Sequence, residues 1–378
     1  MSERSFGRET KFQQVRAGLE TLAHQLGPDA QFPSVRALAG QFGTGLNTLS
    51  GALDDLEARD IVYRRQGVGV FVSPSLSRTM CFLVSPDFFA RGHSPFWDSL
   101  LKAARLRSER GGEKFELHFA QSSEHLGSAL EDGLANRISE GRVSGVIGVG
   151  LREEAANWIG AQNVPFVSLF GPSKGAWGVS VLFDTFNLIE QGVSHLSQNR
   201  CKKIEFWTTV SPETTRAHLE ARPDANREKF FEILGSRGIE RASSAWRTVC
   251  DDLAPHQKAA LSPSEQGFEI ARRVFSKPRD TWPDGIFCGE DILTHGALMG
   301  LQSLGIEVGR DVQIITHANS DSSIFLGHQV PLWLLEYDVN EVVEIVHDAL
   351  SIRFGSELPP NSTDTVLLVA PHLRPLNL

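Results

Sequence analysis

Arginine side chains and a polar turn between residues 34 and 67 provide chemistry that suits a polyanion. Arg36 stands alone, while Arg64 and Arg65 directly precede Gln66 and Gly67. A guanidinium group donates hydrogen bonds in a planar fork that fits a phosphate or the edge of a guanine. A glycine lets the backbone approach a partner closely. These residues favour binding of nucleic acid over catalysis.

The spacing of the apolar residues predicts the elements that position these side chains. The Ser34 hydroxyl can cap a helix, in which apolar residues recur at Val35, Leu38, Ala39 and Phe42. Residues 43–45 interrupt that helix, and a second helical period begins, with Leu46, Leu49, Leu53 and Leu56. Residues 61–65 and 68–72 alternate around a Gln-Gly turn, as hairpin strands do. These elements predict a winged helix-turn-helix, which places a short helix in a DNA groove.

Residues 32–72 resemble the DNA-binding domain of the GntR family of bacterial transcription regulators. The residues that follow the family pattern are Phe32, Pro33, Ser34, Arg36, Leu38, Ala39, Ala52, Leu53, Leu56, Arg65, Gln66, Gly67, Gly69, Phe71 and Val72. The resemblance implies contacts with double-stranded operator DNA from the second helix, the wing and the start of the first helix. The residues expected to make them are Ser34, Arg36, Gly45, Asn47, Thr48, Ser50, Arg64, Arg65, Gln66 and Gly67.

The chain departs from the family pattern where the family reads DNA. Leu46 replaces an arginine, and Ser50 stands where a basic residue is common. A cation that could grip a guanine edge is therefore missing. We expect Leu46 to extend the apolar stripe of Leu49 and Leu53; the alternative is contact with a thymine methyl group.

Composition indicates an ordinary globular protein of two or three domains, at roughly 100–200 residues per domain for the 378 residues. Residues 1–78 hold nine Lys and Arg against eight Asp and Glu, whereas residues 79–378 hold twenty-eight against thirty-eight. The excess negative charge thus belongs to the larger part, which is not expected to contact the phosphates of DNA. We expect a cytoplasmic protein without a signal peptide or membrane contact. Its four cysteines have no pairing or metal-binding spacing and are expected to be reduced core residues: Cys81, Cys201, Cys250 and Cys288.

Short apolar strands alternate with helical stretches after residue 79, which predicts parallel α/β layers. The expected strands are 80–84, 116–119, 145–149, 166–169, 203–207, 285–288 and 312–316, and the expected helices include 97–110, 189–196 and 227–236. These units are too many for one small sheet, so we expect two Rossmann-like lobes. The expected organisation is a winged helix-turn-helix at 1–72, a linker at 73–78 and an effector-binding and dimerisation domain at 79–378.

This second part resembles the effector-binding domain of the LacI/GalR repressors, which is related to periplasmic sugar-binding proteins. The resemblance is carried by 96–101, Val181 with Asp184, 195–196 with 202–204, Phe230 with 238–239, and 285–291 with 296–297 and Gly305. It implies three crossings between two lobes, with a first lobe of about 79–182 and 336–366 and a second of about 183–335 and 367–378. It also implies an effector pocket formed by Phe96, Trp97, Asn226, Arg227, Glu290, Asp291 and Asn319.

Several of these positions differ from the family. Asn226 occupies the slot of the family's effector arginine, with Arg227 one position off, and Glu290 replaces an asparagine. The strand that usually ends in glycine-aromatic-aspartate here ends in 316–319, Thr-His-Ala-Asn. A simple sugar is therefore not the only expected effector, and an unliganded domain remains an alternative. Phe96 and Trp97 could equally fill a core.

No catalytic constellation emerges from the remaining motifs. Residues 171–175 spell GxSxG, but a strand-like stretch follows where a nucleophile elbow needs a helix. Residues 148–150 give only half of a dinucleotide fingerprint, and the histidines lack metal-ligand spacing. We therefore expect no enzyme activity, no cofactor and no metal.

Two functions remain. The first is a homodimeric transcription regulator that acts as a repressor and is controlled by a small molecule such as a sugar derivative. The second is a small-molecule sensor whose winged helix contacts other proteins. The weak charge of residues 1–78 favours the sensor, whereas Arg36 and the wing arginines favour DNA binding.

Overall fold

The computed structural model describes residues 10–74, 76, 78–85, 96–120, 130, 132–140, 142–162, 164–171, 178–210, 224–240, 245–249, 261–320, 322–354 and 365–376. Most of the GxSxG stretch and Cys250 lie outside these residues. The chain divides into two compact units. The first unit comprises 1–88, 103–182 and 343–367, and the second comprises 89–102, 183–342 and 368–378. No helix in the described parts is long and apolar enough to cross a membrane.

The first unit begins with three helices and a hairpin: α1 (Lys11–Leu26), α2 (Val35–Gln41), α3 (Leu46–Ala58), β1 (Val62–Arg65) and β2 (Gly69–Val72). Thr10 and Gln13 form a capping box at the start of α1, so two backbone donors there have partners. Gly43 adopts a positive φ of 53° in the turn between α2 and α3, a conformation that glycine reaches without strain. The two strands pair antiparallel, with Arg65 opposite Gly69.

A small apolar core holds these elements together. Its fully buried members include Leu19 of α1, Leu38 of α2, and Leu49, Leu53 and Leu56 of α3. The spacing of the last three places them on one side of the helix, so the opposite side faces solvent. The winged helix-turn-helix expected from the sequence is confirmed, with α1 as an additional packed helix.

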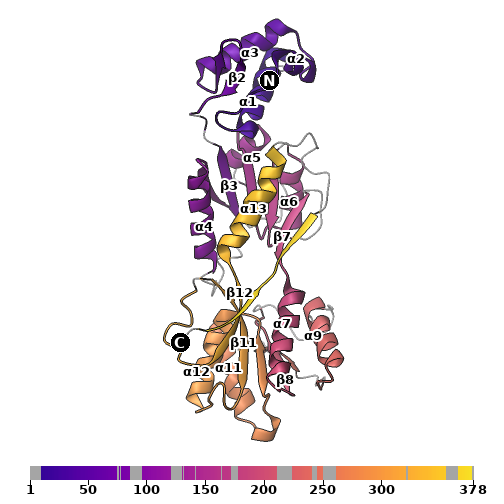
Figure 1. Cartoon of the computed structure of the whole chain (residues 1–378), viewed down its shortest axis with the longest axis vertical. Coiled ribbons are helices and arrows are strands. Elements are labelled where there is room, and N and C mark those ends of the chain that lie inside the picture. The colour runs from indigo at the N-terminus through magenta and orange to yellow at the C-terminus, as the bar shows by residue number, and fades with distance from the viewer. Residues whose placement is uncertain are drawn as a thin grey trace, which may run out of the picture. The chain divides into compact units, whose positions relative to one another are not determined.

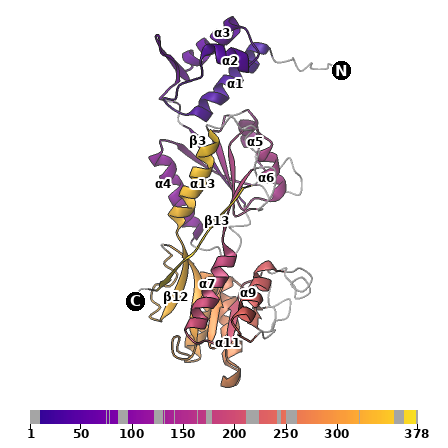
Figure 2. The ribbon, with the colours of Figure 1, turned by 45° about the vertical axis from the view of Figure 1, so that its right-hand side comes forward.

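The rest of the first unit contains a six-stranded sheet in the order β13-β7-β6-β5-β3-β4. The strands are β3 (Thr79–Val84), β4 (Lys114–Phe119), β5 (Gly145–Val149), β6 (Phe166–Leu169), β7 (Val179–Phe183) and β13 (Thr365–Val369). Helices α4 (Phe96–Arg110) and α13 (Val339–Phe354) cover one face, and α5 (Asp132–Ser139) and α6 (Glu153–Gly160) cover the other (Figures 1 and 2). The starts of α4 and α13 and the last residue of β7, Phe183, belong to the second unit. Both faces are covered, which explains why β3, β5 and β6 are buried along their whole length.

The second unit contains a six-stranded sheet in the order β14-β12-β11-β10-β8-β9. Its strands are β8 (Ile204–Trp207), β9 (Trp246–Arg247), β10 (Gly285–Cys288), β11 (Gln313–Asn319), β12 (Leu332–Tyr337) and β14 (His372–Pro375). The neighbouring pairs are parallel except for β12 with β14. The helices are α7 (Thr185–Gln198), α9 (Ala225–Ser236), α11 (Pro263–Phe275) and α12 (Asp291–Ser303), with a short 3-10 helix η4 (Arg279–Thr281).

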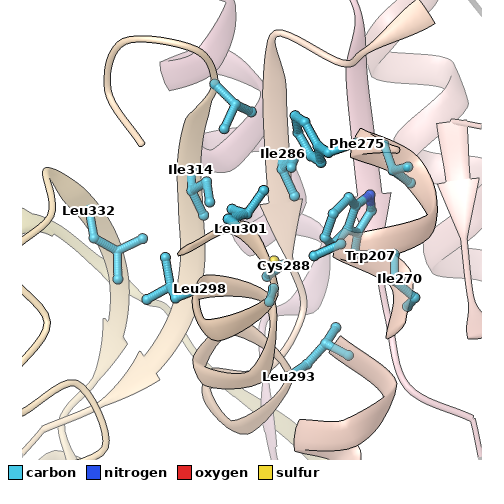
Figure 3. Packing of buried hydrophobic residues seen from close by; sticks show 14 of the residues in the cluster. Trp207, Ile270, Phe275, Ile286, Cys288, Leu293, Leu298, Leu301, Ile314 and Leu332 are labelled. Atoms are coloured by element: carbon cyan, nitrogen blue, oxygen red, sulfur yellow. The ribbon is translucent and has the colours of Figure 1, made fainter. Parts of the chain in front are cut away.

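Alternate residues of these strands point to opposite faces. Trp207, Ile286 and Cys288 pack against Leu293 and Leu298 of α12, as Figure 3 shows. The intervening Phe287 contacts α7, where a Cβ at Gly192 would lie 2.8 Å from its ring. Helices α11 and α12 also approach each other closely, because a Cβ at Gly296 would lie 1.7 Å from the Ser264 carbonyl oxygen.

The expected α/β fold class is confirmed, with two separate sheets of mainly parallel strands. The expected strands at 145–149, 166–169 and 285–288 coincide with β5, β6 and β10, and the other expected strands and helices differ only at their ends. Strands β9, β12, β13 and β14 were not expected from the sequence.

Candidate functional site

The start of α3 is held on the outside of the first helical domain. The Ser34 hydroxyl caps α2 by accepting from the Ala37 amide at 3.2 Å, as the sequence predicts. Helix α2 then packs through Leu38, and the turn that follows presents Gly45 as the N-cap of α3. Asn47 and Ser50 are exposed and Thr48 is half-buried. The first turns of α3 are thus accessible to a partner.

Leu46 does not extend the apolar stripe, and that expectation is wrong. Its side chain is 52% exposed, whereas Leu49 and Leu53 are 0% and 1% exposed. Leu46 is the first residue of α3, and the turn before it, Gly43 to Gly45, carries no large apolar side chain that could cover it. Leu46 therefore belongs to the solvent face together with Asn47 and Ser50.

The three arginines of the proposed DNA face are in different electrostatic states. Arg36 is exposed and forms no ion pair with any described residue. Arg64, by contrast, places Nη1 2.7 Å from Asp54 Oδ1 and 2.7 Å from Glu57 Oε2, both on α3. Two carboxylates thus offset the charge of Arg64, and its attraction for phosphate is reduced accordingly.

Arg65 is oriented by aromatic side chains of the hairpin. Its guanidinium carbon lies 4.8 Å from the ring centroid of Phe71 and 5.4 Å from that of Tyr63. Nη2 also donates to the Tyr63 hydroxyl at 3.0 Å, and that hydroxyl donates to Asp29 Oδ1 at 3.2 Å. Cation–π contacts keep the positive charge of the arginine while they restrict its rotamers. Beyond it, Gln66 and Gly67 form the exposed tip of the wing.

The second unit gathers polar residues where its parallel strands end. The register pairs Trp207 of β8 with Cys288 of β10, and Cys288 with Thr316 of β11. The residues that follow these positions consequently meet at one edge of the sheet. They include Glu290, Asp291 and Asn319, three residues expected at an effector site. In open α/β sheets this edge is the usual place for a ligand.

Asp291, His317 and Asn319 form the centre of this group. Asp291 is 2% exposed and Asn319 is 3% exposed, and Asn319 Nδ2 donates to Asp291 Oδ2 at 3.5 Å. Burial lowers the pKa of His317, against the opposing effect of the Asp291 charge, so the imidazole is neutral at pH 7. Asn319 Oδ1 and His317 Nε2 are buried and have no hydrogen-bond partner among the described residues. Buried polar atoms without partners are costly, which suits atoms that bind a ligand.

Glu290 lies beside this centre and accepts a hydrogen bond from the segment that follows β8. The Thr209 hydroxyl donates to Glu290 Oε1. Burial raises the pKa of Glu290, the hydrogen bond from Thr209 lowers it, and the charge of Asp291 raises it further. The protonated form of Glu290 is therefore favoured more than in water, chiefly because the carboxyl is buried and secondarily because Asp291 is adjacent.

Aromatic rings connect Phe96 to this group. Phe96 is 4% exposed, and its ring centroid lies 5.0 Å from that of Trp97 and 5.7 Å from that of Phe183. Phe183 in turn lies 6.0 Å from His317 and stacks on Tyr337 at 3.8 Å. Phe96 is therefore part of a packed aromatic cluster, and Trp97 lies half-buried at its side.

Asn226 and Arg227 lie at the start of α9 and are engaged elsewhere. Asn226 Oδ1 accepts from the Thr185 hydroxyl at 3.0 Å, at the start of α7. The guanidinium carbon of Arg227 lies 5.8 Å from the ring centroid of Phe231. Neither residue forms a hydrogen bond or ion pair with Asp291 or Asn319 in the described parts of the chain, so the convergence of all the expected residues stays a prediction.

His317, Phe183 and Thr209 were missing from the residues expected at the site. His317 had a signal, because it stands inside the altered strand end at 316–319. Phe183 precedes Asp184, which the resemblance singled out, and Asp184 caps α7 by accepting from the Asn187 amide at 2.9 Å. Thr209 had no signal, since its role depends on the pairing of β8 with β10.

A separate group in the first unit offers potential metal ligands. Cys81, Glu116 and His118 place one ligand atom each within 4.8 Å of one another. However, the Glu116 carboxylate already accepts Arg137 Nη2 at 2.8 Å and Lys114 Nζ at 2.8 Å. Burial raises the pKa of the Cys81 thiol to about 12. In the absence of a metal, two cations therefore pair with the Glu116 carboxylate beside a protonated thiol.

Comparisons with known proteins place both parts of the chain. Residues 13–72 match the bacterial regulatory proteins of the gntR family, and residues 193–371 match the periplasmic binding protein-like domain. The HTH-type transcriptional regulator AglR of Rhizobium meliloti (strain 1021) is 26% identical over 87 residues. That match covers 23% of this chain and 23% of the relative, so the chain spans about a quarter of the curated relative's length.

Solved structures share the fold of the larger part. A LacI family transcriptional regulator from Lactobacillus casei with bound sucrose has a TM-score of 0.54 at 13% identity, over 79% of this chain and 98% of that one. The lac repressor dimer bound to operator and an anti-inducer has a TM-score of 0.55 at 15% identity, over 79% and 93%. The chain therefore joins a DNA-binding domain of the gntR family of bacterial regulatory proteins to a periplasmic binding protein-like domain with a LacI-type fold.

Proposed function

We propose that this protein is a transcription regulator that binds operator DNA as a homodimer and responds to a small polar effector. The observation that carries the proposal is the union in one chain of a gntR-family domain at 13–72 with a periplasmic binding protein-like domain at 193–371. The exposed start of α3 supports the DNA-binding part, as does Arg36, which is exposed and forms no ion pair with the residues that the structure describes.

The DNA contacts follow from the winged helix-turn-helix. In this motif the N-terminal residues of the recognition helix meet base edges, while neighbouring elements contact the backbone. We assign base contacts to the start of α3 and phosphate contacts to Arg36 and Arg65. The complete proposed DNA face is Ser34, Arg36, Gly45, Asn47, Thr48, Ser50, Arg64, Arg65, Gln66 and Gly67.

A homodimer follows from the geometry of operators. One winged helix covers a half-site, and a two-fold operator mirrors a two-fold protein. The lac repressor, which shares the fold of the larger part, is a dimer on its operator. Sedimentation of the full chain at micromolar concentration tests this assignment, and a monomer at that concentration would contradict it.

The effector proposal rests on the strand edge of the second unit. Asn319 Oδ1 and His317 Nε2 are buried without partners in the described chain, and Asp291 supplies a carboxylate beside them. An acceptor, an imidazole and a carboxylate beside aromatic rings suit a hydroxylated ligand such as a sugar derivative. Sucrose bound to the Lactobacillus casei regulator supports this class of ligand. Phe96, Trp97, Asn226, Arg227 and Glu290 complete the proposed set.

Control of DNA binding by the effector is a matter of differential affinity. A ligand shifts the equilibrium between two protein conformations only by the ratio of its affinities for them. The effector therefore changes the affinity for operator by the same factor by which operator changes the affinity for effector. Both affinities can be measured, which makes the linkage testable.

DNA binding is tested first, by a mobility shift with duplex DNA from upstream of the protein's own coding sequence at two salt concentrations. We expect retardation of this DNA in preference to a shuffled duplex, with weaker binding at the higher salt concentration. Equal affinity for both duplexes would count against regulation of this region, and no affinity for any duplex would overturn the proposal.

The effector is sought by thermal-shift screening against sugars, sugar acids and polyols. A ligand present at 100 times its Kd should stabilise the protein by about 2.7 kcal/mol. Asn319→Ala should lose this stabilisation, because it removes the unpartnered acceptor, whereas the matched control Asn136→Ala alters an exposed residue of α5. A stabilising ligand that acts equally on both variants, or that leaves operator affinity unchanged, would refute the assignment.

A further inference from the structure

The solvent face of α3 is neutral over its first turns. Leu46, Asn47 and Ser50 are exposed, and the buried side of the helix is formed by Leu49 and Leu53. Helix α3, Leu46–Ala58, contains no lysine or arginine. The residues that would meet base edges are thus a leucine, an asparagine and a serine.

Exposure of Leu46 is costly without a partner. Leu46 is 52% exposed, so about half of its surface could still be removed from water by an apolar partner. The neighbouring Leu49 is fully buried, so the core of this domain is complete without Leu46. An apolar side chain at the leading end of a recognition helix has one apolar target in the major groove, the C5-methyl group of thymine.

The cations of the domain are placed beside this neutral face. Arg36 on α2 is exposed and unpaired among the described residues, and Arg65 in the wing is held against Phe71. Arg64 is occupied by two carboxylates of α3. Phosphate contacts therefore fall to the flanking elements, and an arginine contact with guanine, the commonest specific contact, is missing from α3.

We propose that α3 reads A·T base pairs, with Leu46 packed on a thymine methyl group and Asn47 hydrogen-bonded to the N6 and N7 edge of an adenine. This inference rests on the proposed function and specifies the operator that the function requires. Leu46 acts as a specificity-determining residue, because only thymine offers a methyl group in the groove. Ser50 accommodates either kind of pair, since a hydroxyl can donate or accept.

The experiment selects binding sequences with the full-length protein from a pool of random duplexes. We expect each enriched half-site to contain a thymine and a nearby adenine that no other base replaces. Each such thymine is then replaced by deoxyuridine, which removes the methyl group and keeps the pairing and the O4 acceptor. The loss of one buried methyl should weaken binding about three- to fourfold per half-site.

Variants assign the contact to Leu46. Leu46→Ala should bind the thymine and deoxyuridine duplexes equally, whereas the control Leu326→Ala, which alters a leucine that is 87% exposed in the second unit, should keep the difference. Leu46→Arg should shift the selected base at this position from thymine to guanine. A parallel measurement with 7-deazaadenine should weaken wild-type binding and leave Asn47→Ala unaffected.

The outcomes separate this inference from the proposed function. An enriched two-fold sequence whose affinity is unchanged by deoxyuridine, or which has invariant guanines at the positions facing α3, would overturn the A·T readout and leave the regulator intact. If no sequence is enriched, the proposed function fails and the readout fails with it.

Discussion

Neutralising the two carboxylates that pair with Arg64 should strengthen DNA binding. In the wild-type protein Arg64 Nη1 lies 2.7 Å from both Asp54 Oδ1 and Glu57 Oε2, so these three side chains carry a net charge of −1. Asp54→Asn/Glu57→Gln would change this local charge to +1 and leave the cation free beside the wing. Glu57 also accepts from the Arg64 amide at 3.2 Å, a bond that glutamine can preserve.

The size of the effect follows from counterion release. Each phosphate that a cation newly neutralises steepens the dependence of log K on log salt concentration by about 0.9. Extrapolated over the tenfold range between 1 M and 0.1 M salt, one added contact corresponds to roughly an eightfold gain in affinity at 0.1 M. Two half-sites should together steepen the slope by about 1.8.

The assay is fluorescence anisotropy on a selected operator at several salt concentrations. Adding Arg64→Ala to the double variant should cancel the gain, because the released cation is then absent. Glu228→Gln/Glu232→Gln on α9 makes the same change in net charge at two exposed positions and serves as the control. An unchanged salt slope in Asp54→Asn/Glu57→Gln would refute the reasoning, as would an equal gain in the control.

Three further predictions concern binding and stability. Arg36→Ala should weaken operator binding and reduce the salt slope by about 0.9 per half-site, because it removes a phosphate contact; anisotropy titration at several salt concentrations measures this, with Arg310→Ala as an exposed control. Burial lowers the pKa of His347 from 6.5 to about 4, so the unfolded chain binds more protons between these values and stability falls as the pH drops from 6.5 toward 4. This loss should approach about 3 kcal/mol in denaturant titrations, and His347→Gln should lack it. Gly296→Ala should lower the free energy of unfolding by roughly 1–3 kcal/mol or more, and with it the melting temperature, because its Cβ would lie 1.7 Å from a carbonyl oxygen of α11. In the control Gly133→Ala, the added Cβ meets no atom within 4 Å, so the substitution should be tolerated.

The effector site could be predicted from the sequence only in part. Apolar runs predicted β10 and β11, and the resemblance to the LacI/GalR effector domain implied the ligands Asp291 and Asn319 at or just after the ends of these strands. Parallel strands bring their carboxyl ends to one edge, so the 3.5 Å contact between these two side chains is consistent with the pattern. The Thr209 hydroxyl joins Glu290 only because β8 pairs with β10, and a single sequence does not contain that pairing.

Local signals determined most of the N-terminal domain by themselves. The Ser34 cap, the leucine period of α3 and the Gln-Gly turn act over a few residues, so the helix and hairpin boundaries could be predicted from neighbouring residues. The tertiary structure decided what those elements present to a partner. Leu46 shares the spacing of Leu49 and Leu53 yet is exposed, and Arg64 shares the charge of Arg36 yet is paired. Burial and ion pairing depend on which other segment lies opposite a side chain, and that is fixed only when the whole chain packs.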